Sequence, residues 1–172
     1  MNNIKISLLF TLSINLFSYS QIISENEVTN YAISNIEEFV EFLSYPNDAN
    51  NKEDIEKLIN WTSNRFNELG FKIKKLETES VPLLLAELVY KKSYNTILIY
   101  LHLDGQPVDK SKWYQESPYK PELKEPGNNG EYVIIDWGKL DNKTLENLDS
   151  EDIRIFARSA SDAKGPVMML IN

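Results

Sequence analysis

Two stretches in the first half of the chain repeat their apolar residues every three or four positions, which is the period of an amphipathic helix. The first, from Val28 onward, carries a candidate capping box at Ser34 and Glu37 and stops at a proline-containing turn. The second begins after Asn51, a favourable N-cap residue, and ends where Gly70 can terminate a helix. The expected buried positions are Ile33, Ile36, Val40 and Leu43 in the first stretch and Ile55, Leu58, Ile59, Thr62, Phe66 and Leu69 in the second. The sequence therefore predicts two helices that each pack one apolar face on a core.

Shorter apolar runs predict strands at residues 71–76, 81–90, 132–137 and 153–157. Residues 143–148 favour a helical turn, and residues 167–171 open an apolar helix with Pro166 in its first turn. After Asp109 the chain has little regular pattern for about forty residues, apart from the short strand at 132–137 and the turn at 143–148. Loops of this length are often functional, although a solvated insertion fits as well. This order of elements predicts a layered domain of mixed helix and sheet, α/β or α+β.

Residues 96–101 carry apolar side chains on both faces, which predicts a fully buried strand. This run ends at His102, the only histidine of the chain, and Asp104 follows two residues later. Both side chains point to the same side if the chain stays extended, and the carboxyl ends of buried strands are where open α/β sheets bind ligands. His102 and Asp104 are therefore candidate site residues. The alternative is a capped strand whose histidine bonds to a neighbouring loop.

A second polar segment, residues 158–166, lies between the strand predicted at 153–157 and the helix predicted at 167–171. Asp162 thus also follows the end of a strand, as His102 does, and it lies before the start of a helix, where a ligand residue would be expected. The alternative is an ordinary turn in which Lys164 is a surface residue.

Composition limits the partners and the metal ligands that this chain can have. The 172 residues suit one domain, and 42% hydrophobic with 26% charged residues indicates a globular chain. A net charge of −8 argues against nucleic acid or an anionic membrane as a partner. Because the chain has no cysteine, a metal site would have to use histidine, aspartate and glutamate.

Residues 1–20 have the features of a cleavable signal peptide. Lys5 is their only charge, residues 6–17 are mostly apolar but too few to span a bilayer, and Ser18 and Ser20 are small residues ahead of a cleavage site. We expect a mature start at Gln21, a secreted or periplasmic protein and no stable membrane anchor. A buried N-terminal helix is the alternative.

Several short motifs together resemble the M20 family of zinc metallopeptidases, which comprises carboxypeptidases, dipeptidases and related N-acyl amidohydrolases. In chain order they are His102-Leu103-Asp104, Pro107-Val108-Asp109, Trp113, Pro118-Tyr119 and Arg158-Ser159-Ala160-Ser161-Asp162-Ala163-Lys164-Gly165. The resemblance covers roughly residues 31–172. It implies a layered helix–sheet–helix catalytic domain, of which residues 21–172 would be the N-terminal portion. The rest of the catalytic part and an inserted dimerisation domain would follow Asn172, with a homodimer as the expected full-length state.

The resemblance also implies roles for individual residues. His102 would bind one zinc ion, and Asp104, counted as catalytic, would hold the other ring nitrogen. Asp162 would bridge two zinc ions, and the peptide bond between Asp162 and Ala163 would be cis. The substrate would be a small peptide or an N-acyl amino acid, attacked by a metal-activated water. The glutamate general base and the remaining ligands of the family have no counterpart among these residues.

Two observations keep other readings open. The family's usual Gly-Arg-Gly is Ala157-Arg158-Ser159 here, which removes the conformational freedom of glycine. His102 and Asp162 alone would hold zinc poorly, since stable sites use three or four protein ligands. A non-catalytic, metal-free remnant is therefore one alternative. A serine hydrolase using Ser159 or Ser161 with His102 is another, although no Gly-x-Ser-x-Gly elbow surrounds either serine.

Overall fold

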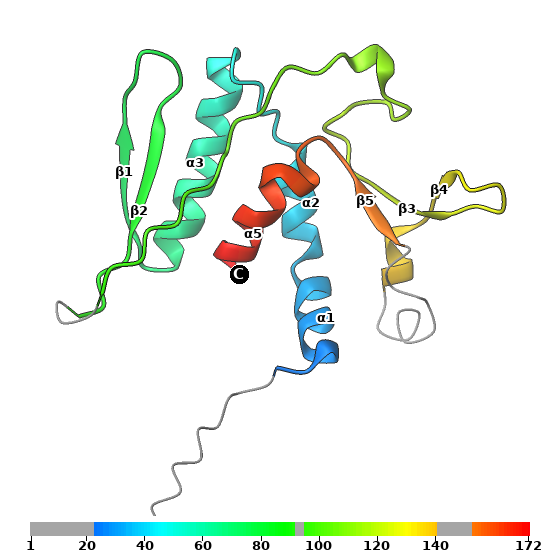
Figure 1. The fold of residues 1–172 in the computed structure, drawn as a ribbon, viewed down its shortest axis with the longest axis horizontal. Coiled ribbons are helices and arrows are strands. Elements are labelled where there is room, and N and C mark those ends of the chain that lie inside the picture. The colour runs from blue at the N-terminus through cyan, green and yellow to red at the C-terminus, as the bar shows by residue number, and fades with distance from the viewer. Residues whose placement is uncertain (1–22, 92–94, 141–152) are drawn as a thin grey trace, which may run out of the picture.

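The computed structural model describes residues 23–91, 95–140 and 153–172, and it combines helices with two small antiparallel sheets (Figure 1). The helices are α1 Glu25–Ser34, α2 Ile36–Ser44, α3 Lys52–Glu68 and α5 Gly165–Ile171, with short 3₁₀ turns at Lys110–Lys112 and Trp137–Leu140. The strands are β1 Lys72–Leu76, β2 Leu83–Glu87, β3 Glu122–Pro126, β4 Tyr132–Ile134 and β5 Arg154–Phe156. The expectation of a mixed helix and sheet class is confirmed.

The predicted first helix is in fact two helices, α1 and α2, which meet at Asn35. The capping box lies at the start of α1, where the Ser24 side chain accepts from the Glu27 amide and the Glu27 carboxylate accepts from the Ser24 amide. The box predicted at Ser34 is wrong, because Ser34 lies in the last turn of α1 and its hydroxyl donates to a carbonyl of that turn. The predicted stop after Ser44 is confirmed.

Helix α3 agrees closely with its prediction. Asn51 is the N-cap and accepts a hydrogen bond from the amide of Asp54. Its buried residues are Ile55, Leu58, Ile59, Thr62 and Phe66. Leu69 was expected among them but is 44% exposed, because it follows the last turn of the helix as the C-cap. Gly70 then takes the left-handed φ of 85° that ends the helix, a region glycine enters without steric cost.

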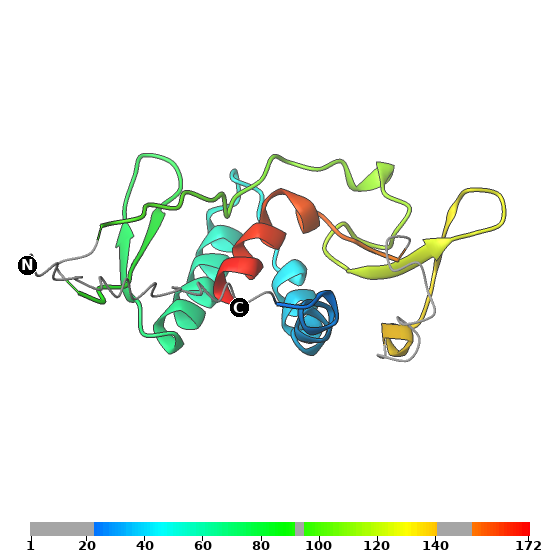
Figure 2. The ribbon, with the colours of Figure 1, turned by 60° about the horizontal axis from the view of Figure 1, so that its bottom comes forward.

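The main core is shared by three helices. Phe42 of α2, Leu58 and Phe66 of α3, and three residues of α5 form one buried cluster; the α5 members are Val167, Met168 and Ile171. Figures 1 and 2 show α5 lying between α2 and α3. The Phe42 ring stacks on Trp61 with centroids 4.5 Å apart. Helix α5 is therefore held by packing on both α2 and α3, and Asp162 lies just before its first residue.

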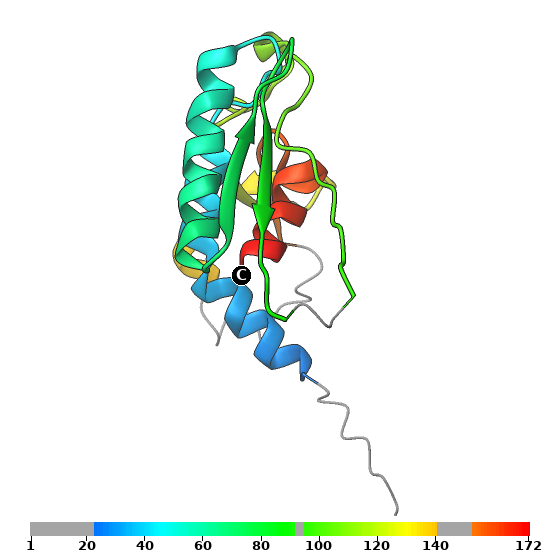
Figure 3. The ribbon, with the colours of Figure 1, turned by 90° about the vertical axis from the view of Figure 1, so that its left-hand side faces the viewer.

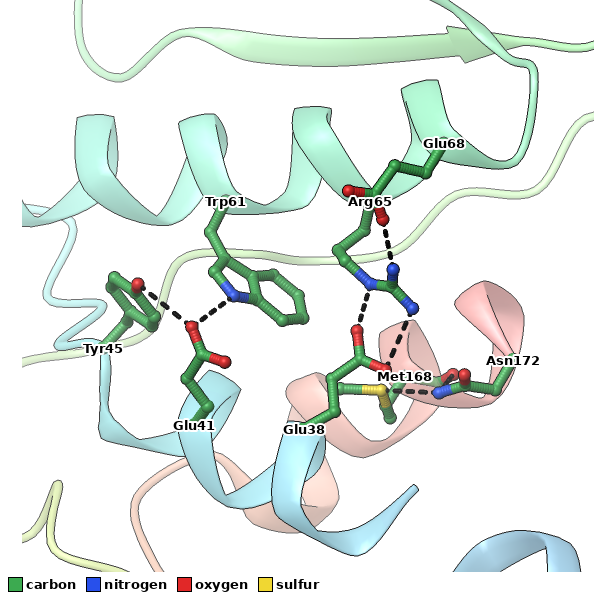
Figure 4. Close-up of polar contacts among 8 residues, drawn as sticks. All are labelled: Glu38, Glu41, Tyr45, Trp61, Arg65, Glu68, Met168 and Asn172. Atoms are coloured by element: carbon green, nitrogen blue, oxygen red, sulfur yellow. Dashed lines mark hydrogen bonds and ion pairs between the residues drawn. The ribbon is translucent and has the colours of Figure 1, made fainter. Parts of the chain in front are cut away.

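Polar contacts also fix α2 against α3 (Figure 4). The indole Nε1 of Trp61 donates to a Glu41 carboxylate oxygen at 2.9 Å, and the guanidinium of Arg65 donates to the Glu38 carboxylate at 3.0 Å. These contacts lie on the half-exposed side of the interface. Apolar burial therefore contributes most of its stability, and the polar contacts fix how the two helices are oriented.

The two sheets lie on opposite sides of the helices. Strands β1 and β2 form an antiparallel hairpin, with Lys72 opposite Glu87 and Leu76 opposite Leu83, that packs along α3 (Figure 3). The second sheet has the order β4-β3-β5, also antiparallel. The strands predicted at 71–76, 81–90, 132–137 and 153–157 are all present with narrower bounds. Strand β3 was not predicted, because its sequence is polar and ends in a proline.

Residues 96–101 do not form the fully buried strand that their composition predicted. They take part in neither sheet, and Ile97 and Leu98 are each 85% exposed. Among the described residues no strand pairs with them on either side, so they belong to no sheet whose faces other elements could cover. Only the carboxyl end is anchored, where Leu101 and Leu103 pack against the main core.

Two predictions concern residues outside the described part: the signal peptide at 1–20 and the helical turn at 143–148. Within residues 23–91, 95–140 and 153–172, no helix is long and apolar enough to cross a membrane.

Candidate functional site

The three residues singled out from the sequence, His102, Asp104 and Asp162, line one cleft of about 690 Å³. Two chain segments build most of its wall: residues 102–107, after the exposed extended run, and residues 157–162, after β5. The ring of Trp113 also lines it. The fold therefore brings together two motifs that lie far apart in the sequence.

His102 and Asp104 lie on the same side of their segment, as the extended spacing predicted. Nδ1 of His102 is 3.9 Å from Oδ1 of Asp104, which is an electrostatic contact and longer than a hydrogen bond. The histidine side chain is 59% exposed and the aspartate 39%. The edge of the imidazole also meets the Tyr100 ring, with centroids 5.1 Å apart. More than half of the imidazole is therefore exposed at the cleft.

Asp162 lies in the short π-helical segment Ala160–Lys164 that leads into α5, and the helical backbone is interrupted at this residue, with φ −132° and ψ 102°. Its side chain faces solvent at the cleft. The peptide bond between Asp162 and Ala163 is cis, as the family resemblance implies.

Ser159 occupies the place where the family has a glycine, and its backbone is left-handed with φ 62°. An L-residue pays about 1–2 kcal/mol for this conformation, whereas glycine does not. The serine side chain is buried, and its Oγ accepts a hydrogen bond from Nδ2 of Asn47 at 3.0 Å. Ser159 thus takes a backbone conformation that suits glycine, and its side chain adds a hydrogen bond to Asn47.

Lys164 is fully buried, so its interpretation as a surface lysine is wrong. Its Nζ donates to the carbonyl oxygens of Phe42 at 2.9 Å and Leu43 at 3.3 Å, and also to that of Tyr45. These carbonyls close the C-terminal end of α2, where a cation is favourable. Burial lowers the pKa of Lys164 to about 7, while the three carbonyls favour the ammonium, which has one N–H for each of them.

Two further residues of the site were not predicted. Asn47 is 1% exposed and donates from Nδ2 to the Leu103 carbonyl oxygen at 3.1 Å as well as to Ser159. Nη2 of Arg158 donates to the carbonyl oxygen of Gln106 at 2.9 Å. Both contacts join the His102 segment to the Asp162 segment. The sequence gives no signal for either pairing, because each depends on segments that meet only in the fold.

The metal-binding capacity of these residues is partial. An imidazole and two carboxylates are the donor types that zinc accepts, so the residues fit in kind. However, within the described ranges no group of three or more histidine, cysteine, aspartate or glutamate side chains is close enough to hold one metal ion. The described cleft therefore carries donors for part of a zinc site and not for a complete one.

The serine alternative receives no support from the geometry. Among the described residues, no hydrogen bond joins Ser159 or Ser161 to His102, and the Ser159 hydroxyl is buried against Asn47. A serine nucleophile needs its base within hydrogen-bond reach.

Comparison of the chain with protein-family models, with curated proteins and with solved structures finds no match.

Proposed function

We propose that this chain belongs to a zinc-dependent hydrolase of the M20 type, which cleaves the peptide or amide bond of a small peptide or an N-acyl amino acid. The observation that carries the proposal is the placement of His102, Asp104 and Asp162 in one cleft by two separate segments. Each of these residues lies at the position that the family motifs assign to a metal-site residue.

In this proposal His102 would bind a zinc ion through one imidazole nitrogen. Asp104, whose Oδ1 lies 3.9 Å from Nδ1 of His102 on the same side of the segment, would orient the ring and raise its basicity. Asp162 projects its carboxylate from the turn before α5 toward the same cleft. The chemistry that a zinc ion held there would supply is an activated water and polarisation of the scissile carbonyl. The further donors and the general base would come from groups outside the described residues.

The proposal includes the finer features that the resemblance implies. They are a layered helix–sheet–helix catalytic domain, a homodimer of the full-length protein, and export to the periplasm or the exterior after removal of residues 1–20. The mixed helix and sheet architecture and the order of the motifs support the first of these, the sequence of residues 1–20 supports export, and the homodimer rests on the resemblance alone.

The test is zinc content and hydrolysis in the natural gene product that carries these residues. We expect purified protein to contain zinc, and a chelator to abolish hydrolysis of dipeptides or N-acyl amino acids until zinc is added back. His102→Ala and Asp162→Asn should each lose metal and activity together. Asp136→Asn is the matched control, since this aspartate does not line the cleft and only accepts from the Gly138 amide.

The alternatives give different results. Hydrolysis that survives complete removal of zinc would contradict the proposal and favour metal-independent chemistry. Protein that binds no zinc and hydrolyses none of these substrates would correspond to the non-catalytic remnant.

A further inference from the structure

The segment between α2 and α3 contacts both walls of the cleft. Its Asn47 is almost completely buried, yet no part of the sequence motifs includes it. A buried amide is retained only where its hydrogen-bonding groups are satisfied. The partners of Asn47 therefore show what this side chain holds together.

The first partner is the segment that carries His102 and Asp104. Nδ2 of Asn47 donates to the carbonyl oxygen of Leu103 at 3.1 Å, between the two site residues. The backbone carbonyl of Asn47 accepts from the Gly105 amide at 2.7 Å, and the Gly105 carbonyl accepts from the Ala49 amide at 3.0 Å. Side chain and backbone thus fix this segment on both sides of Asp104.

The second partner is the turn that carries Asp162. Nδ2 of Asn47 also donates to Oγ of Ser159 at 3.0 Å, at the beginning of this turn. The other end of the turn is held by Lys164, whose Nζ donates to carbonyls at the end of α2, a few residues before Asn47. The turn is therefore anchored at both ends on one short stretch, residues 42–47.

This stretch is itself firmly placed. Phe42 is buried in the main core and stacks on Trp61, and the carboxylates of α2 accept from Trp61 and Arg65 of α3 (Figure 4). An amide that bonds to both site segments from such a support sets the distance between them.

We infer that Asn47 is a positioning residue that holds the His102 segment and the Asp162 turn at the separation that a shared metal site requires. This inference rests on the proposed function, since the metal site belongs to that proposal. Asn47 touches neither metal nor substrate and acts through the Leu103 carbonyl and the Ser159 hydroxyl.

The experiment compares Asn47→Leu with Thr62→Val in the natural gene product. Leucine has a similar volume but no donor. Thr62 is a matched control because it is equally buried, at 1% exposed, and loses one hydrogen bond, from Oγ1 to the Leu58 carbonyl, far from the cleft. The probes are Zn²⁺ affinity, measured by competition with a chelator, and the visible absorption of bound Co²⁺, which reports coordination geometry.

We expect Asn47→Leu to lower Zn²⁺ affinity about 10-fold or more and to change the Co²⁺ spectrum, while Thr62→Val changes neither. Should Asn47→Leu prevent folding, Ser159→Ala removes only the bond to the turn and should lower the affinity by a smaller factor. Equal affinities in Asn47→Leu, Ser159→Ala and Thr62→Val would overturn the inference.

Failure of the proposed function gives a distinct result. If the unmodified protein binds no Zn²⁺, the metal proposal is wrong, and hydrogen exchange at the Gly105 and Ala49 amides then decides the role of Asn47. Faster exchange in Asn47→Leu than in Thr62→Val would support its anchoring role, and equal exchange would overturn it.

Discussion

Replacing Gly165 by alanine separates two physical effects that act in opposite directions. Gly165 is the first residue of α5, directly after the turn that carries Asp162. By helix propensity alone, alanine is favoured over glycine by up to about 1 kcal/mol in a helix interior, and by less in a first turn. The contacts at this position give the opposite expectation.

The magnitude follows from the space around Gly165. A Cβ built there would lie 2.5 Å from the backbone carbonyl oxygen of Ala160, well inside ordinary van der Waals contact, and 4.0 Å from the Phe39 ring. A backbone atom cannot rotate away, so the turn must shift as a whole. Overpacking of this kind costs about 1–3 kcal/mol. After subtracting a propensity gain of about 0.5 kcal/mol, we expect Gly165→Ala to lower the free energy of unfolding by about 0.5–2.5 kcal/mol.

Urea denaturation followed by circular dichroism measures this change. With a slope of about 2 kcal/mol per molar urea, the midpoint should fall by about 0.3–1.2 M. Asn60→Ala on the exposed face of α3 is the control, and it should raise the midpoint slightly, because it carries the propensity gain without a close contact. A midpoint for Gly165→Ala equal to or above that of the unmodified chain would refute the reasoning.

Two further predictions concern the core and the cleft. Phe42→Ala should lower the free energy of unfolding by about 3–5 kcal/mol by urea denaturation, because it empties a fully buried site beneath the stacked Trp61 ring; a loss below about 1 kcal/mol would show that the site collapses or is not buried. Asp104→Ala should weaken Zn²⁺ affinity about 10–100-fold by chelator competition. Asp109 does not line the cleft, so Asp109→Ala should leave the Zn²⁺ affinity unchanged. If both variants weaken Zn²⁺ affinity equally, Asp104 does not have the role proposed for it.

Local signals in the sequence were sufficient where a single element decides its own structure. Helix α3 was predicted with its N-cap and most of its buried stripe, because an apolar period, a capping asparagine and a terminal glycine all lie within that one segment. Strand β3 was missed because it is polar, and pairing with β4 and β5 rather than its own composition makes it a strand.

The candidate site shows the same division. His102, Asp104 and Asp162 could be selected from motifs and from their places at the ends of elements, and the fold does bring them to one cleft. The roles of Lys164 and Asn47 could not be predicted, since the carbonyls and the hydroxyl that bind their side chains belong to segments more than fifty residues away. Hydrogen bonds of that range carry no local pattern in the sequence.

Residues 96–101 and the partial metal site can be explained together. Their side chains are apolar on both faces, as in an interior strand, yet Ile97 and Leu98 are exposed and no described strand pairs with them. The same segment leads directly to His102, which within the described ranges belongs to no group of three or more side chains that could hold one metal ion. Under the proposed function one arrangement would explain both points: strands paired alongside residues 96–101 would place these residues inside a larger sheet, whose two faces other elements would cover, and would bring further donors to the end of the strand at His102. Amide exchange tests this: slow exchange at residues 97–100 in the natural gene product agrees with it, and exchange as fast as in an unstructured peptide contradicts it.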